Sequence, residues 1–246
     1  MKFNYKFKVL FQDAGRRDRI RLSRFVDMVI NAIVKCADDN GDGLNVLRAH
    51  KAIWVLAKLG VEIKEVPMRD DELTFEAWCE KSGRGLSVRN VRIWKDDAEH
   101  KDGRRLMAKV RSLWASIDTE SREMCDVYER GVPRNEDGEK LLMPRVSDTI
   151  HYEGEPINEY HHCVRYSDLD ANGHCNSGRY FEILLDAIEP DEDFMPNRFE
   201  ITYIKESMLG QVLNVRWCRD AVGYRFHVDT ISGEHCCRAA IECANL

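Results

Sequence analysis

The chain repeats one helical pattern at a constant spacing of 155 residues. Residues 25–33 (FVDMVINAI) align with residues 180–188 (YFEILLDAI), and both segments carry apolar residues at helical spacing. The same spacing places Asp13 over Asp168. An internal repeat of this kind indicates two duplicated domains that pack against each other. A chain of 246 residues is long enough for two domains of ordinary size.

Each copy follows the same order of elements, which is a strand, a long helix and then several antiparallel strands. Apolar periodicity predicts helices over residues 22–37 and 176–188. A long helix wrapped by an antiparallel sheet in each copy predicts an α+β fold with two units side by side, which is the architecture of tandem (double) hot-dog proteins. Alternating residues predict strands over residues 4–11, 54–65, 73–80, 86–94 and 105–117, and then over residues 158–167, 198–205, 212–220, 224–231 and 235–243.

A segment rich in charge, glycine and proline separates the two copies. It has no apolar period, and it contains turn-forming residues such as Gly131 and Pro144. We therefore expect an N-terminal hot-dog domain over residues 1–130, a connector over residues 131–157, and a C-terminal hot-dog domain over residues 158–246. The two domains are called the first half and the second half below.

Composition limits the classes of function that fit this chain. A net charge of −6 argues against general nucleic-acid binding, which depends on neutralising phosphates. No run approaches the roughly 18 apolar residues that a membrane span needs, and the charged N-terminus does not resemble a signal peptide, so a cytoplasmic location is expected. The nine cysteines lack paired metal-ligand spacing, so we expect reduced thiols and no metal or cofactor.

The most informative segment lies between the first strand and the helix of the second half. It places Asp170, Asn172 and His174 at alternate positions, followed by Asn176 and Ser177 where the helix cap is expected. Free N–H groups at a helix start stabilise negative charge, so a carbonyl oxygen becoming an oxyanion would be favoured there. The same residue types also serve as plain turn and capping residues, and the histidine could be a packing residue.

The first half differs at the equivalent positions, where it carries Gly15, Arg17 and Arg19. A loop with a purely structural role has no need to differ so completely between the two copies. This contrast favours one active half, the second, and one degenerate half, the first.

The sequence resembles the acyl-ACP thioesterases of plant plastids and bacteria along nearly its whole length. In the second half the resemblance rests on residues 167–177 (SDLDANGHCNS) with Tyr180, and on residues 203–210 (YIKESMLG). The resemblance implies a double hot-dog fold and hydrolysis of fatty acyl-ACP thioesters to free fatty acid and carrier protein. In the first half it rests on residues 52–67 (AIWVLAKLGVEIKEVP), 71–78 (DELTFEAW) and 112–118 (SLWASID).

The family's catalytic residues, carried over position by position, fall on Asp170, Asn172, His174 and Glu206. Plant members have a cysteine directly after the glutamate, whereas this chain has Ser207. A mechanism with a nucleophile at that position is therefore not expected here.

The mechanism we expect is direct attack by water, with oxyanion stabilisation at the helix start. Glu206 or His174 serves as general base, Asn172 orients the water or the carbonyl, and Asp170 fixes the loop and the imidazole. Cys175 is an alternative thiol beside His174, but neighbouring side chains in an extended stretch point apart.

The resemblance implies acyl carrier protein as the partner, with a fatty acyl chain on its phosphopantetheine arm. The first half is expected to hold the acyl chain in an apolar pocket, lined by helix residues such as Met28 and Ile33. Acyl carrier protein is acidic, so arginines are the candidates for docking. These are Arg16, Arg17, Arg19, Arg21 and Arg24, with the scattered Arg165, Arg179 and Arg198.

Three rival functions stay open on the sequence alone. The chain could be an acyl-CoA thioesterase, a hot-dog dehydratase or a non-catalytic acyl-binding module. A homodimer formed through exposed strand edges is also left open, as are the length and saturation of the acyl chain.

Overall fold

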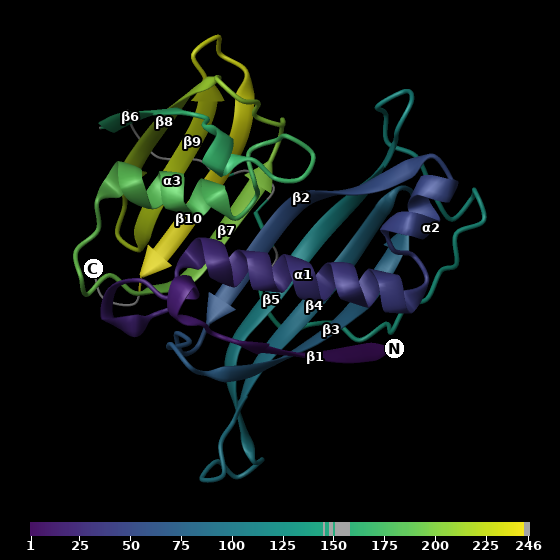
Figure 1. The fold of residues 1–246 in the computed structure, drawn as a ribbon, viewed down its shortest axis with the longest axis horizontal. Helices are drawn as coiled ribbons and strands as arrows, with labels where there is room; N and C mark the ends of the chain where they lie inside the picture. The colour runs from purple at the N-terminus through teal and green to yellow at the C-terminus, as the bar shows by residue number, and fades with distance from the viewer. Residues whose placement is uncertain (145, 148–149, 151–157, 244–246) are drawn as a thin grey trace.

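Ten strands of the described residues form one antiparallel sheet (Figure 1). The computed structural model describes residues 1–144, 146–147, 150 and 158–243, so the remaining residues of the predicted connector and residues 244–246 of the predicted C-terminal domain lie outside it. The strand order is β1-β3-β4-β5-β2-β7-β10-β9-β8-β6. The strands are β1 (Lys2–Lys8), β2 (Ala52–Ile63), β3 (Glu72–Gly83), β4 (Leu86–Asp96), β5 (Arg104–Asp118), β6 (Asn158–Cys163), β7 (Pro196–Tyr203), β8 (Val212–Arg219), β9 (Gly223–Thr230) and β10 (His235–Cys243).

The two halves join where β2 pairs with β7, with Gly60 opposite Glu200. Two helices, α1 (Leu22–Asn40) and α3 (Arg179–Ile188), lie on the same face of the sheet and contact each other (Figure 1). Phe199 of β7 packs against Phe25 of α1 and Phe181 of α3, with ring centroids 6.4 and 4.7 Å away. The hydrophobic core is therefore shared between the halves.

The helices approach closely where α3 begins. A Cβ atom at Gly178 would lie 2.7 Å from a carboxylate oxygen of Asp27 and 2.8 Å from the carbonyl oxygen of Ser23. Ser23 also donates a hydrogen bond to Glu182. Glycine at position 178 thus permits a contact between α1 and α3 that a larger residue would disrupt.

The predicted helices and strands match the structure, with differences at their ends. The first helix runs on to Asn40, where Gly41 in the left-handed conformation ends it. The prediction that α3 starts at Asn176 is wrong by three residues, because the side chain of Asn176 instead accepts hydrogen bonds from the N–H groups of Gly178 and Arg179. A short helix, α2 (Leu44–Ala49), was not predicted.

Both first strands end earlier than predicted, at equivalent places in the two halves. The chain leaves β1 for a 3₁₀ turn at Phe11–Asp13, and it leaves β6 for a 3₁₀ turn at Tyr166–Asp168. In each half the buried aspartate that ends the turn accepts a hydrogen bond from the N–H three residues before it and pairs with the arginine eleven residues after it. The spacing of 155 residues therefore holds for contacts as well as for sequence.

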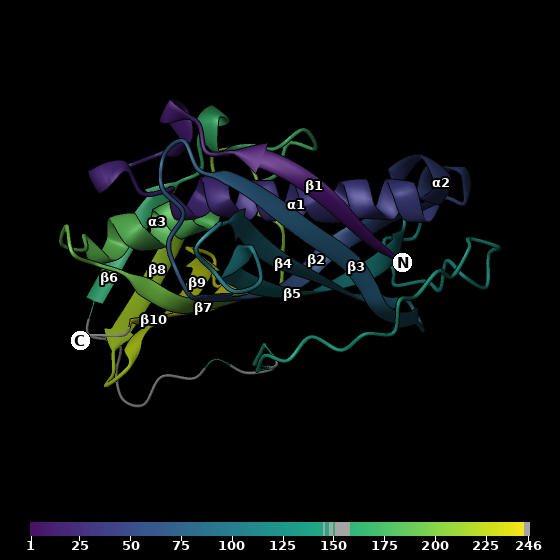
Figure 2. The ribbon, with the colours of Figure 1, turned by 90° about the horizontal axis from the view of Figure 1, so that it is seen from below.

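The described part of the connector lies across the face of the sheet opposite the helices (Figure 2). The carbonyl oxygen of Glu139 accepts a hydrogen bond from the indole N–H of Trp78 at 2.8 Å, and its carboxylate pairs with Lys2 and Arg92. Further along, Val146 packs against Gly60. A Cβ atom added at position 60 would lie 2.6 Å from Cγ2 of Val146. The domain boundaries inferred from the sequence stay a prediction.

Candidate active site

The candidate catalytic residues lie on two loops of the second half that contact each other through their backbones. One loop leads into α3 and carries Asp170 to His174, and the other follows β7 and carries Glu206. The N–H of Cys175 donates to the carbonyl oxygen of Ser207 at 2.8 Å, and His174 forms a β-bridge with Met208. This pairing brings Nε2 of His174 to 3.4 Å from Oε2 of Glu206.

Asp170 shapes the first loop through backbone contacts. Its Oδ1 accepts hydrogen bonds from the N–H groups of Asn172 at 2.8 Å and His174 at 3.1 Å. Its own N–H donates to the carbonyl oxygen of His174 at 2.8 Å, and Gly173 supplies the positive φ of +82° that the tight turn requires. Asp170 therefore holds the backbone of His174 rather than its ring, and Asn172 lies exposed on the loop.

Glu206 has a second neighbour, the cation Arg122, which no sequence pattern predicts. Nη2 of Arg122 lies 3.1 and 3.3 Å from the two carboxylate oxygens of Glu206. Arg122 belongs to the first half, in the turn that follows β5. No motif pointed to it, because the contact arises only when β5, β2 and β7 are paired side by side.

Two side chains with possible nucleophilic atoms lie beneath the loops. Ser207 is fully buried, and its Oγ is 2.7 Å from the hydroxyl of Tyr180. Burial raises the pKa of the Cys175 thiol to about 12, so this thiol stays protonated at neutral pH. Neither side chain is placed to attack a substrate from the surface.

The first half contains the same backbone arrangement without the catalytic side chains. The N–H of Gly15 donates to the carbonyl oxygen of Arg19 at 2.8 Å, as Asp170 does to His174. The N–H of Ile20 donates to the carbonyl oxygen of Pro67 at 2.9 Å, as Cys175 does to Ser207. Val66 therefore occupies the position equivalent to Glu206. We call this arrangement, made by Gly15, Arg17, Arg19 and Val66, the first-half site.

Profiles of one protein family cover most of the chain. The profile described as acyl-ACP thioesterase N-terminal domain matches residues 1–132, and the profile described as acyl-ACP thioesterase C-terminal domain matches residues 152–245. The chain belongs to the acyl-ACP thioesterase family. The family resemblance found in the sequence is thereby confirmed.

Solved structures of acyl-ACP thioesterases share the fold of this family member. An acyl-ACP thioesterase from Bacteroides thetaiotaomicron is 25% identical with a TM-score of 0.79, and the match covers 98% of this chain and 97% of that one. The 12:0-ACP thioesterase from Umbellularia californica is 18% identical with a TM-score of 0.76, covering 98% and 96%. This likeness confirms the predicted α+β tandem hot-dog fold, although α3 is much shorter than α1.

Curated plant relatives match only part of this acyl-ACP thioesterase family member. Oleoyl-acyl carrier protein thioesterase 2, chloroplastic, from Arabidopsis thaliana is 24% identical over 157 residues, which are 58% of this chain and 40% of that protein. The matched part of the chain thus spans less than half the length of that relative.

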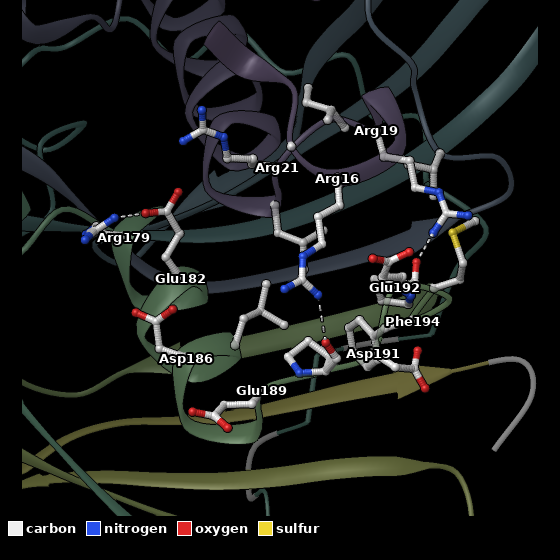
Figure 3. Close-up of a pocket in the computed structure, with 18 of the residues that line it drawn as sticks. Arg16, Arg19, Arg21, Arg179, Glu182, Asp186, Glu189, Asp191, Glu192 and Phe194 are labelled. Atoms are coloured by element: carbon white, nitrogen blue, oxygen red, sulfur yellow. Dashed lines mark hydrogen bonds and ion pairs between the residues drawn. The ribbon is translucent and has the colours of Figure 1, made fainter.

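A cavity of about 1060 Å³ adjoins the first-half site rather than the candidate catalytic residues (Figure 3). Gly15, Arg16, Arg19 and Val66 line one side, and residues along α3 from Arg179 to Asp186, with residues 189–192 and 194–196, line the other. Carboxylates and arginines are mixed in this lining, as Figure 3 shows. The charge pattern therefore does not favour an anion over a cation.

The arginines considered for docking are largely held by contacts inside the protein. Arg16 and Arg19 donate to the carbonyl oxygens of Pro190 and Glu192, and Arg17 pairs with Asp193. Arg21 donates to carbonyl oxygens of residues 12 and 14, and Arg24 pairs with residues 13 and 27. Much of this stretch thus links the first half to the second.

The part of the chain that the structure describes contains no helix with the length and apolar character needed to cross a bilayer, and no group of three metal-ligating side chains. The nine cysteines are free thiols. Met28 and Ile33, proposed to line an acyl pocket, are buried in the shared core, and their role toward an acyl chain stays a prediction.

Proposed function

We propose that this chain hydrolyses fatty acyl thioesters carried on acyl carrier protein, releasing a free fatty acid and the carrier thiol. The observation that carries the proposal is the 3.4 Å approach of His174 to Glu206 at the loop leading into α3. The first half, which shares the same loop geometry, has Arg19 and Val66 at these positions. Membership of the acyl-ACP thioesterase family supports fatty acyl-ACP as the class of substrate.

The reaction needs a base for water and a site for the oxyanion. Glu206 or His174 takes a proton from water as the water oxygen attacks the thioester carbonyl. The tetrahedral intermediate then breaks its C–S bond, and the departing thiolate takes that proton from the base. General-base catalysis of this kind contributes about 10²- to 10⁴-fold. The positive end of the α3 dipole is the candidate for stabilising the oxyanion, since the N–H groups of Gly178 and Arg179 are themselves bonded to Asn176.

The remaining two candidates have supporting roles in this proposal. Asp170 fixes the loop by accepting the N–H groups of Asn172 and His174. Asn172 is exposed on the same loop, where its amide would orient water or the carbonyl. An acyl-enzyme is not required, and the buried positions of Cys175 and Ser207 support direct attack by water.

Acyl carrier protein and the phosphopantetheine-borne acyl chain are the proposed partners, and the cytoplasm is the proposed location. The plant relatives are named chloroplastic, so the compartment needs its own test by localisation of a tagged chain. A homodimer also stays a prediction, to be checked by light scattering.

The test is release of free thiol from acyl-ACP and acyl-CoA panels of varied chain length. Intact protein should hydrolyse acyl-ACP, whereas His174→Ala and Glu206→Ala should not. Val66→Ala is the matched control for Glu206→Ala, because Val66 occupies the position of Glu206 in the first half, and it should keep full activity. A folded protein that hydrolyses no acyl-ACP would contradict the proposal. Turnover of acyl-CoA alone would indicate an acyl-CoA thioesterase. Formation of an enoyl product would indicate a dehydratase.

A further inference from the structure

We propose that Arg122, supplied by the first half, is a positioning residue that holds Glu206 in its catalytic orientation. The inference rests on the proposed function, since it assigns a part in that reaction to a residue of the half that lacks the catalytic side chains. Arg122 acts through Glu206 and is not itself placed in contact with the thioester.

The geometry around Glu206 is that of a carboxylate held from two sides. Nη2 of Arg122 reaches both carboxylate oxygens, at 3.1 and 3.3 Å, while His174 Nε2 lies 3.4 Å from Oε2. A glutamate side chain that is partly exposed would otherwise sample several rotamers. Contact with a cation on one side and an imidazole on the other restricts the carboxylate to the place where it faces His174.

The backbone at Arg122 is unusual for a residue with a side chain. Its φ is +63°, in the left-handed region that mostly glycine adopts. Its N–H donates to the carbonyl oxygen of Asp118 at 3.0 Å, and the N–H of Asp118 donates to the carbonyl oxygen of Glu123 at 2.9 Å. The turn therefore closes on itself and directs the Arg122 side chain across the junction of the two halves.

The side chain of Asp118 stabilises this turn. The N–H of Ser121, the guanidinium of Arg130 and the N–H of Glu120 all donate to its carboxylate, and they hold its pKa well below the usual range. The carboxylate is thus ionised at neutral pH, and its hydrogen bonds keep the turn in one conformation. A turn built in this way can present one side chain at a fixed position.

Another cation lies close by in the chain but is used elsewhere. Lys205 precedes Glu206, yet it pairs with Glu234 rather than with Glu206. Arg122 is more exposed than Glu206, with 58% against 38% of the side chain accessible, so it could instead contact the phosphate of an incoming phosphopantetheine arm. The two roles differ in kinetics, because a positioning residue affects kcat and a substrate contact affects KM.

The experiment compares wild type, Arg122→Ala, Arg122→Lys and the control Lys205→Ala in acyl-ACP hydrolysis. We expect Arg122→Ala to lower kcat about 10- to 100-fold with little change in KM. Added guanidinium ions should restore part of the lost kcat, and Arg122→Lys should retain more activity than Arg122→Ala. Lys205→Ala should behave as wild type.

Two results would overturn the inference while leaving the proposed function intact. One is an Arg122→Ala variant with the kcat of wild type, and the other is a loss expressed only in KM and not rescued by guanidinium. A wild-type protein that hydrolyses no acyl-ACP would overturn the proposed function, and the role of Arg122 with it.

Discussion

Nε2 of His174 lies 3.4 Å from Oε2 of Glu206, although the loop with His174 precedes α3 in the chain and the loop with Glu206 follows β7. Residues that act as one unit show non-additive effects when both are changed. We expect His174→Ala and Glu206→Gln each to lower kcat/KM for acyl-ACP by about 10²- to 10⁴-fold. The double variant should be no worse than the weaker single variant, as measured by thiol release. Multiplied losses would show that the two residues act independently.

Asp170 should matter through the loop that it shapes. Asp170→Ala removes the acceptor for the N–H groups of Asn172 and His174. The free energy of unfolding should therefore fall by about 1 to 2 kcal/mol, and the rate of hydrolysis should fall as well. Asp170→Asn keeps an acceptor oxygen and should retain most of the stability and activity. Urea unfolding with parallel rate measurements checks both. Equal losses in the two variants would instead point to a direct role for the carboxylate charge.

Cys175 should be dispensable for catalysis, because burial keeps its thiol protonated. We expect Cys175→Ala to retain hydrolysis and the native protein to resist alkylation at this residue, as followed by mass spectrometry of digested protein. Inactivation that tracks modification of Cys175 would refute this and restore the thiol as a nucleophile.

The same thiol should make stability depend on alkaline pH. The pKa of Cys175 is about 12 in the folded chain against an ordinary value of 9.0, so unfolding releases its proton between these two values. The stability contributed by the protonated Cys175 thiol is fully present below pH 9. Above pH 9 the free energy of unfolding falls by about 1.4 kcal/mol per pH unit, until the pH reaches the folded-state pKa of about 12. Unfolding curves at pH 8 and 10.5 should therefore differ less for Cys175→Ala than for wild type. An identical pH dependence in both proteins would argue against the raised pKa.

The first-half site should be silent in hydrolysis. Val66 is equivalent to Glu206 and lines the cavity beside this site, so Val66→Trp should fill space without touching the catalytic pair. We expect kcat/KM within about twofold of wild type, while the matched variant Glu206→Trp loses activity. A well-folded Val66→Trp protein with impaired hydrolysis would mean that the first-half site takes part.

The repeat carries much of what the sequence could predict about the fold. The long apolar stripe of residues 22–37 predicts the start of α1 correctly, and the loop with Asp170 and His174 differs from its first-half counterpart in sequence. Helix ends were less predictable, since Asn176 caps from outside α3. The six-residue α2 is too short to show a period.

The approach of Arg122 to Glu206 could not be read from the sequence. It depends on the order β5-β2-β7 within the sheet, and strand order is a long-range property that local pattern does not encode. The contacts of Arg16, Arg17 and Arg19 could not be predicted for a related reason, because their partners at residues 190–193 come from the other half. In both cases the sequence does not show which segments of the two halves lie side by side.

The pairing of β2 with β7 inside one chain has a consequence for how this enzyme family member responds to dilution and to mutation. In a dimer of separate subunits, a site completed by the neighbour is lost when the subunits dissociate. Here the residues from both halves stay together at any protein concentration, because the link between them is covalent. A fused chain also lets a substitution fall on one half alone, so Glu206 could be kept while its counterpart became Val66. Covalent fusion thereby removes the symmetry that an identical pair of subunits would impose.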